Sequence, residues 1–470
     1  MFKNILWVFL EKGALTIIQF VALLILSRIL GPEDYGIYGV MMIFIAVSNI
    51  LVDSGLSGAL VQKKEIQSVD INTLFIANTA ISIFLYVLLF LSAPLIEHFY
   101  DIPNLSSYIR VLGLSILIFA LSQVQNALII RNLQFRKSTV INVVASTVSL
   151  IAAILVAKKG FGVWALIYQN LINSIVVTLL MWLTTKTKIG INVSKESFSF
   201  LWKFGSYVLG ENLLDTIVNN ITTSIIPKID SIGKSGLYFQ ASKISSIPNN
   251  IIGLSVDKFS FPVLSKEKER TVFLEKARLI NKNLILIIIP LFSLLAYCSY
   301  PIIQLVLGEK WLDVAPYFSV LIWSGIGMLI QVFFRSMIKA NGITKYLLHA
   351  EIIKSVVYLA GIMISASISV WAIIYCVVIM SVFGALLWAV YVKKVLGFRY
   401  RDQLSDMKKP IISLSIMILT IWFLNVPEQS YLRLAIVVLA YLEYLVINYL
   451  LKNQEILVLL NRAKVYFFEK

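Results

Sequence analysis

The sequence predicts an all-α protein that crosses a membrane many times, and three observations carry this prediction. Of its 470 residues, 59% are hydrophobic and only 14% are charged, whereas an ordinary soluble domain carries about 25% charged residues. Apolar runs of roughly 20 residues, long enough to cross a hydrocarbon layer of about 30 Å, recur along the whole chain. The first run has no small-residue cleavage site after it, so we expect a retained span and not a removed signal peptide.

Polar residues, glycine and proline divide the chain into about fourteen apolar segments of helical length. The expected spans lie near residues 14–30, 36–60, 71–96, 108–129, 138–157, 162–184, 204–227, 236–262, 283–307, 314–338, 343–367, 369–392, 409–425 and 432–451. The two longest connections, 185–203 and 263–282, are rich in lysine. Because all connections are short, we expect no separate soluble domain.

Lysine and arginine are concentrated in alternate connections. If the N-terminus is cytoplasmic, the inside segments include QKKE, RNLQFRK, SKEKER and KKVLGFRYR. All inside segments together hold about 30 of the 41 basic residues, and the outside connections hold about 7. This asymmetry predicts both termini in the cytoplasm. The same distribution accounts for the net charge of +16 without a nucleic-acid partner.

A short stretch occurs twice, which predicts an internal repeat. Gly36-Ile37-Tyr38 aligns with Gly236-Leu237-Tyr238, and each copy follows an apolar span and a polar outer turn. Six spans, an even number, separate the copies, so both have one orientation. This predicts two six-helix lobes in a parallel pseudo-twofold repeat with a cavity between them. The expected parts are an N-lobe over 1–190, a C-lobe over 191–400, and two C-terminal helices with a cytoplasmic tail over 401–470.

Enzymatic signatures are missing from the sequence. It contains no zinc-protease helix, nucleophile elbow or dinucleotide fingerprint. The letters GKS at 233–235 resemble part of a phosphate-binding loop, but Lys228 stands where that loop needs its first glycine. Cys298 and Cys376 lie in separate apolar runs and are expected to pack, as is His349. We therefore expect a protein that is not an enzyme and that holds no cofactor and no metal.

Acids inside spans are costly, so they are the first candidates for function. In the seventh span, Glu211 and Asp215 are four residues apart and share a helix face. Asn219 and Thr222 continue that face, which could bind a proton or a sodium ion and couple transport to a gradient. A wet cavity wall, or pairing of these acids with Lys243 in the next span, explains them equally well.

Two further acids are candidates for ion coupling. Asp53 lies deep in the second span and has no evident partner in its own helix. Glu351 lies three residues before Lys354 in the eleventh span. An internal ion pair is the simpler interpretation of that spacing.

Five cations in or near the spans are candidates for binding an anionic substrate, namely Lys243, Lys354, Arg28, Arg110 and Arg335. Such cations make charge-assisted hydrogen bonds to the oxygens of phosphate or pyrophosphate. They would suit a neutral or cationic drug poorly. Snorkelling to the interface is the alternative for the three arginines, which lie toward span ends.

Two stretches resemble a known family. Residues 24–64, LILSRILGPEDYGIYGVMMIFIAVSNILVDSGLSGALVQKK, resemble the amino-terminal signature of the polysaccharide transporter family. Residues 235–253, SGLYFQASKISSIPNNIIG, fit the corresponding segment of the second lobe. That family comprises the Wzx-type O-antigen flippases and teichuronic-acid exporters of the multidrug/oligosaccharidyl-lipid/polysaccharide superfamily.

The resemblance implies a V-shaped pair of six-helix lobes with two added helices. It implies export of undecaprenyl-pyrophosphate-linked oligosaccharide across the bacterial cytoplasmic membrane by alternating access. It further implies contact with membrane lipids and with a polymerase and other surface-polysaccharide assembly proteins. Cationic cavity residues of the family carry over to Arg28, Lys243 and the other cations in the spans.

Three other readings compete with this one. A cation-coupled multidrug exporter of the same superfamily would share the fold but favour an acidic or aromatic cavity. Major-facilitator carriers usually have a glycine-acid-arginine loop where VQKKEIQSVD stands here. A polysaccharide polymerase or lipid-linked glycosyltransferase usually needs sizeable external loops, and the outer connections here are short. The sequence leaves open which glycan is carried and which ion, if any, drives transport.

Overall fold

The computed structural model describes residues 2–451 and 453, with gaps at 54, 64, 188, 343–344, 425 and 429. Side chains are described for these residues except at 2–6, 8, 9, 204, 207, 208, 211, 345, 348 and 404. Every regular element in this part of the chain is a helix, which confirms the predicted all-α class. The chain divides into two compact units, residues 1–239 and 240–470.

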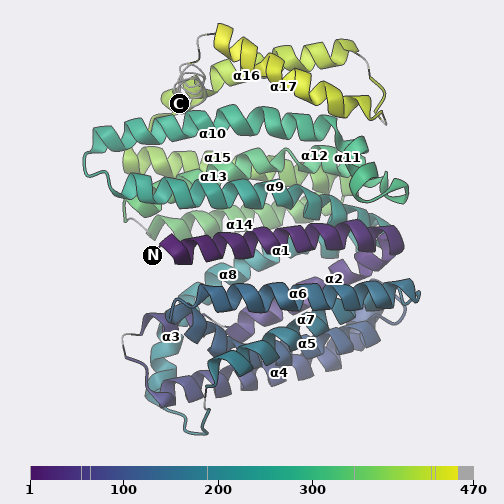
Figure 1. Ribbon diagram of the computed structural model, residues 1–470, viewed down its shortest axis with the longest axis vertical. Helices are drawn as coiled ribbons and strands as arrows, with labels where there is room; N and C mark the ends of the chain where they lie inside the picture. The colour runs from purple at the N-terminus through teal and green to yellow at the C-terminus, as the bar shows by residue number, and fades with distance from the viewer. Residues whose placement is uncertain are drawn as a thin grey trace. The chain divides into compact units, whose positions relative to one another are not determined.

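The first unit is a bundle of long helices. Its elements are α1 (Phe2–Ile29), α2 (Pro32–Asp53), α3 (Leu56–Gln62), α4 (Ser68–Tyr100), α5 (Leu105–Arg131), α6 (Phe135–Lys158), α7 (Trp164–Thr185), α8 (Lys195–Ile229) and the start of α9 (Ile232–Ser265). Within it α5 packs against both α4 and α7, α6 against α1 and α7, and α2 against α8 (Figure 1). Aliphatic side chains of α2, α5 and α7 fill the centre of the unit.

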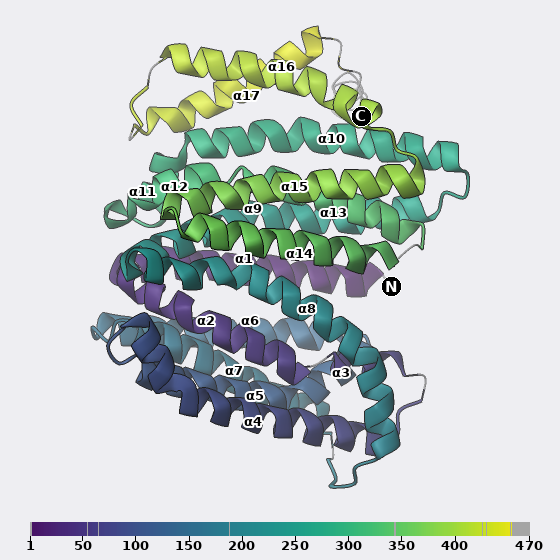
Figure 2. The same ribbon diagram turned by 180° about the vertical axis from the view of Figure 1, so that it is seen from behind.

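The second unit contains the rest of α9 and the following elements. These are α10 (Arg270–Tyr297), α11 (Ser299–Val306), a 3₁₀ turn (Glu309–Trp311), α12 (Val314–Leu321), α13 (Ser324–Ala340), α14 (Lys345–Ala366), α15 (Val370–Leu396), α16 (Tyr400–Leu424) and α17 (Leu432–Leu450). Helix α15 packs against α13 and α14, while α16 packs against α10 and α17 (Figure 2).

Local sequence sets the helix boundaries. Pro32 occupies the first position of α2, where its missing N–H costs nothing. Asp34, in the first turn, accepts a hydrogen bond from the N–H of Gly31 at 2.9 Å and complements the helix dipole. At the other end of the chain, α15 begins after Ser369, whose hydroxyl accepts the N–H of Ala372, and ends at Gly397 in the left-handed region.

Twelve helical segments of the described chain are long and apolar enough to cross a membrane. Helices α8 and α9, with 35 and 34 residues, supply the remaining two of the expected spans. Both are long enough to cross a membrane. They are more polar than the other spans, because they carry many serine, threonine, asparagine and charged residues. The chain is therefore a multi-pass membrane protein with about fourteen spans.

Several boundaries differ from the expected ones. The second span is broken near Gly55, which has φ 66°, so that α2 and α3 replace one helix. The connection expected at 263–282 is helical from Arg270 onward, because charged residues are tolerated where a helix leaves the apolar layer. Helix α8 and the start of α9 join the first unit. The lobe limits at 190 and 400, which follow from the repeat, remain predictions.

Candidate functional site: a charged cluster on α9, α13 and α14

The second unit contains a group of charged and polar side chains that come from three helices. We call it the charged cluster, and its members are Asp257 of α9, Arg335, Ser336 and Lys339 of α13, and Glu351 and Lys354 of α14. The three α13 members lie within five residues, so they occupy neighbouring positions on the helix. The sequence had singled out Arg335, Glu351 and Lys354, and the structure brings these three together.

Glu351 is the centre of one half of the cluster. Its side chain is 2% exposed, and a carboxylate so deeply buried needs compensating charge. The ammonium group of Lys354, one turn further along α14, contacts one carboxylate oxygen directly. A guanidinium nitrogen of Arg335 lies 4.0 Å from the other oxygen. The predicted internal ion pair is thus confirmed, and Arg335 joins it from the neighbouring helix.

Asp257 is the centre of the other half. The hydroxyl of Ser336 donates a hydrogen bond to its carboxylate, and the ammonium group of Lys339 lies 4.0 Å away. Sequence reasoning missed these three residues. Asp257 and Ser336 are 79 positions apart, and only tertiary packing joins them.

The cluster contains more cations than carboxylates. Among its described members, Arg335, Lys339 and Lys354 are cations, and Asp257 and Glu351 are carboxylates. The side chains of Arg335 and Lys354 remain 31% and 18% exposed. An arginine fork and a lysine point charge together suit the oxygens of a phosphate or pyrophosphate.

The other candidate cations lie elsewhere. Arg28 is exposed in the last turn of α1. Arg110 stacks over the ring of Phe90, 4.4 Å from its centroid, and donates to the carbonyl of the same residue, so it ties α5 to α4. Lys243 is half-buried on α9, in the part that belongs to the second unit.

The candidate coupling acids other than Glu351 lie on helices of the first unit. Asp215 is exposed on α8, and so is Asn219 one turn later. The side chain of Glu211 lies outside the described residues, so the expected pair of carboxylates stays a prediction. Asp53 is the last residue of α2, beside the break at Gly55.

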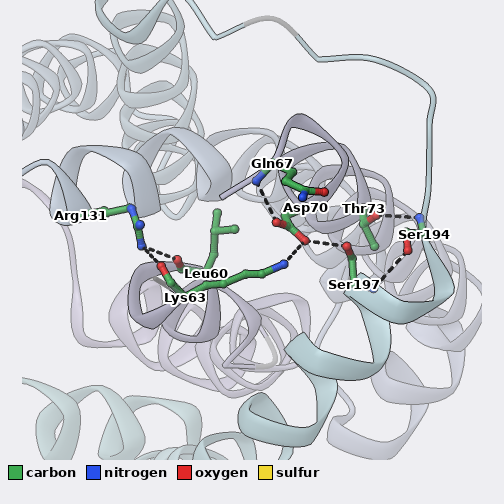
Figure 3. A network of polar contacts seen from close by, with 8 residues as sticks. All are labelled: Leu60, Lys63, Gln67, Asp70, Thr73, Arg131, Ser194 and Ser197. Carbon is green, nitrogen blue, oxygen red and sulfur yellow. Dashed lines mark hydrogen bonds and ion pairs between the residues drawn. The ribbon is translucent and has the colours of Figure 1, made fainter. Parts of the chain in front are cut away.

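The first unit contains a second polar group, which the sequence analysis missed (Figure 3). Asp70, in the first turn of α4, is buried and accepts three interactions. These are an ion pair from Lys63 at 2.6 Å, a hydrogen bond from the Ser197 hydroxyl, and the backbone N–H of Gln67 at 3.0 Å. Gln67 and Asp70 form a capping box, which was the one signal available in the sequence.

Neighbouring contacts add a second tie to the start of α8 and bring in α5. The hydroxyl of Thr73 accepts the N–H of Ser194, just before α8 begins. The guanidinium of Arg131, at the end of α5, donates to the carbonyls of Leu60, Val61 and Lys63 at the end of α3. The network therefore ties the start of α8 to the start of α4, and it ties the end of α5 to the end of α3.

Two further groups have structural roles. His349 shares a 2.6 Å hydrogen bond with the hydroxyl of Tyr391, in line with the expected packing role. Cys298 and Cys376 are buried and free. Within the residues that the structure describes, no group of three or more histidine, cysteine, aspartate or glutamate side chains could hold a metal ion.

The long apolar helices and the two units define a multi-pass membrane protein whose second unit contains a cluster of charged side chains. The chain belongs to the polysaccharide biosynthesis protein family, whose profile matches residues 25–316.

Individual relatives agree with this assignment. The chain is 23% identical over 398 residues to the lipopolysaccharide biosynthesis protein WzxC of Escherichia coli (strain K12), an alignment that covers 83% of this chain and 80% of WzxC. It is 25% identical over 327 residues to the teichuronic acid biosynthesis protein TuaB of Bacillus subtilis (strain 168), covering 68% and 67% of the two chains. The solved structure of the lipid II flippase MurJ in an inward closed conformation superposes with a TM-score of 0.79 at 16% identity, over 96% of this chain and 99% of MurJ.

Proposed function

We propose that the protein moves lipid-linked oligosaccharide, a repeat unit of a surface polysaccharide on an undecaprenyl pyrophosphate carrier, across the bacterial cytoplasmic membrane. The family assignment and the named relatives support this class of substrate. A fold shared with a lipid flippase supports movement across the bilayer. Transport by alternating access requires two states with different affinity for the substrate. No step in this proposal breaks a covalent bond, so the protein acts as a transporter and not as an enzyme.

The charged cluster is the observation that carries the proposal. A pyrophosphate linkage is the one strongly anionic part common to such substrates, whatever their sugars. Arg335 and Lys354 converge on a single buried carboxylate, and Lys339 lies on the same helix. A substrate pyrophosphate would compete with Glu351 for these cations, which gives a site that binds and then releases its ligand.

The orientation completes the proposal. The cluster lies where α13 ends and α14 begins, at a connection that the distribution of basic residues assigns to the cytoplasm. Both termini are assigned to the same side. A cluster at the cytoplasmic end would meet the substrate where it is synthesised. The sugar chain would then pass to a polymerase or another assembly protein on the outer side.

Coupling to an ion gradient belongs to the same proposal. Asp215 lies on α8 among polar residues, and it is accessible enough to exchange a proton or a sodium ion. Lys243 is proposed as a second contact for the anionic linkage, because it is a half-buried cation within a span.

The experiment is a flipping assay in proteoliposomes with a fluorescent undecaprenyl-pyrophosphate oligosaccharide. We expect Arg335→Ala and Lys354→Ala each to slow flipping about tenfold, the effect of losing roughly 1.4 kcal/mol of charge-assisted binding. Arg335→Lys should retain part of the rate, since it keeps the charge and loses the fork.

Lys394→Ala provides the matched control, because Lys394 is an exposed cation in the last turn of α15 and outside the cluster. Its rate should equal that of the parent. If all three variants at 335 and 354 flip the substrate at the parental rate, the cluster has no part in transport. If the parent moves cationic dyes and leaves the lipid-linked sugar in place, the protein is a multidrug exporter instead.

A further inference from the structure

An apolar groove runs along the first unit between α2, α4 and α8. Its volume is about 650 Å³, within the usual range for ligand sites. Its walls include Val47 of α2, Leu85, Leu88 and Ile96 of α4, and Ile221 and Ile225 of α8. We call it the α2/α4/α8 groove. It is separate from the charged cluster, which belongs to the second unit.

The groove is long for its volume. Its wall on α4 runs from Leu85 to Tyr100, which is about 22 Å of helix at 1.5 Å per residue. That length is most of a hydrocarbon layer of about 30 Å. A long and narrow apolar site fits an extended hydrocarbon chain better than a compact ligand.

Few polar side chains line the groove, and two of its hydroxyls donate within their own helices. The hydroxyl of Ser92 donates to the carbonyl of Leu89, and that of Ser224 donates to the carbonyl of Asn220, each within its own helix. Each of these two hydroxyls keeps only its acceptor lone pairs for a ligand. Because most of the lining is aliphatic, the walls suit hydrocarbon better than a glycan.

One end of the groove carries a single cation. Lys228, in the last turn of α8, is exposed, and its ammonium group lies 4.7 Å from the centroid of the Phe99 ring. The nearby acid Asp230 is paired with Lys234 at 2.5 Å. Within the described part of the chain, no carboxylate forms an ion pair with Lys228.

The distribution of basic residues in the connections predicts that the Lys228 end of the groove faces the outside of the cell. The end of α4 and the turn after α8 both belong to connections assigned to the outside. A lysine and an aromatic ring at the end of an apolar groove match the headgroup level of a bilayer, where a phosphate would lie.

We propose that the α2/α4/α8 groove holds the polyprenyl chain of the lipid-linked product, with its phosphate against Lys228, on the side where the product leaves. This inference rests on the proposed function and adds a product site to it. One isoprenoid chain with one anionic end accounts for the length of the groove, its apolar walls and its lysine. A second site of this kind lets the product stay bound after its pyrophosphate has left the charged cluster.

Photocrosslinking tests the site. A genetically encoded diazirine amino acid replaces Leu88 in the full-length protein, reconstituted in nanodiscs with radiolabelled polyprenyl phosphate. Val87 is the matched control position, because it is 47% exposed against 55% for Leu88 and does not line the groove. We expect labelling from position 88 at least fivefold stronger than from position 87, and saturable by unlabelled polyprenyl phosphate.

Two competitors and two variants of Lys228 identify the occupant. Polyprenol, which lacks the phosphate, should compete at least fivefold less well than polyprenyl phosphate, and Lys228→Ala should remove that difference while Lys228→Arg keeps it. Phosphatidylglycerol should compete weakly. If it competes as well as polyprenyl phosphate, the groove is a site for membrane phospholipid and the proposal is overturned.

The flipping assay separates the two proposals. Equal, unsaturable labelling from positions 87 and 88 in a protein that flips the substrate would overturn the groove and leave the flippase intact. Saturable labelling from position 88 in a protein that flips nothing would retain the polyprenyl site and overturn the flippase.

Discussion

Gly36 and Gly236, the paired glycines of the internal repeat, each lie against the backbone at the start of the other's helix. A Cβ built on Gly36 would collide with the carbonyl of Ile232, and one built on Gly236 would collide with the carbonyl of Pro32. The contact is reciprocal, as expected for two copies of one sequence motif related by a twofold axis. Small residues permit this close approach of helices inside membranes.

We predict that Gly36→Ala or Gly236→Ala separates α2 from α9 at this end. A methyl group there has backbone in its way and no flexible side chain to displace, and overpacking of this kind costs about 1–3 kcal/mol. The measurement is maleimide labelling of Ser235→Cys, since Ser235 is fully buried and donates to the carbonyl of Thr223 at 2.8 Å. Labelling should rise several-fold in either alanine background.

Gly233→Ala is the control for the glycine prediction. A Cβ at Gly233 meets nothing within 4 Å, although it lies on the same turn of α9 as Gly236. Labelling of Ser235→Cys should stay at the parental level in that background. Equal labelling in all three alanine variants would show that the contact between the two glycines does not hold α2 and α9 together.

The network around Asp70 gives a prediction about stability. Asp70→Asn removes the charge that compensates Lys63 and weakens the hydrogen bond from Ser197. We expect the free energy of unfolding to fall by about 2 kcal/mol, the usual range for buried hydrogen bonds to a charged group. Limited proteolysis should cut faster between residues 186 and 194, because the start of α8 loses its attachment. Glu65→Gln, an exposed acid in the same connection, should change neither measurement.

The orientation of the chain is testable with single cysteines. We expect Lys268→Cys and Lys408→Cys to be shielded from a membrane-impermeant maleimide in whole cells, and Asp101→Cys and Lys310→Cys to be labelled. All four side chains are exposed, so shielding reports the side of the membrane and not burial. The native Cys298 and Cys376 are buried and should give little background. External labelling at position 408 would invert the topology.

The sequence predicts the spans well because a single physical quantity, apolar length, decides them. Twelve of the fourteen expected spans correspond to described helices that are apolar enough to cross a membrane, and the more polar α8 and α9 account for the other two. The pairing of Glu351 with Lys354 follows from their spacing on one helix. The break near Gly55 was not predicted, because the residues on both sides are apolar and a periodicity argument continues through a single glycine.

Contacts between distant segments could not be predicted. Asp257 meets Ser336, and Asp70 meets Ser197 across 127 positions, only because helices far apart in the sequence pack together. For α8, the sequence predicts which residues share a face but not what packs against that face. Helical spacing places Glu211 and Asp215 on one face, but spacing says nothing about which neighbour covers that face.

The charged cluster predicts an effect of Glu351→Gln that a structural ion pair alone would not give. Glu351 competes with any anion for Arg335 and Lys354, so removing its charge should tighten the binding of pyrophosphate at least fivefold in detergent solution. The same variant should lower the melting temperature, because Arg335 and Lys354 then lose the carboxylate that lies between them. Glu275→Gln makes the same charge change at an exposed position on α10 and should alter neither quantity. Weaker pyrophosphate binding in Glu351→Gln would show that the cluster is only a structural ion pair.

The final prediction concerns coupling and rests on Asp215. If this carboxylate binds and releases a proton or a sodium ion during the cycle, Asp215→Asn removes the ion while keeping the shape of the side chain. Gradient-driven flipping in proteoliposomes should then fall at least tenfold, while the affinity for lipid-linked oligosaccharide changes less than twofold. This split is expected because alternating access needs an ion affinity that differs between states, whereas substrate binding in one state does not.

Glu211→Gln and Asp101→Asn complete this test. The first should have a smaller effect than Asp215→Asn. Glu211 precedes Asp215 by one turn, toward the end of α8 that the predicted topology places in the cytoplasm, and water reaches a carboxylate there more easily. Asp101→Asn makes the same chemical change at an exposed residue after α4. Asp101 has a left-handed backbone conformation, which asparagine also tolerates, so this variant should behave as the parent. Imposed proton and sodium gradients, applied one at a time, identify the coupling ion. If Asp215→Asn responds to both gradients as the parent does, Asp215 only lines a wet surface of α8 and another group couples the ion.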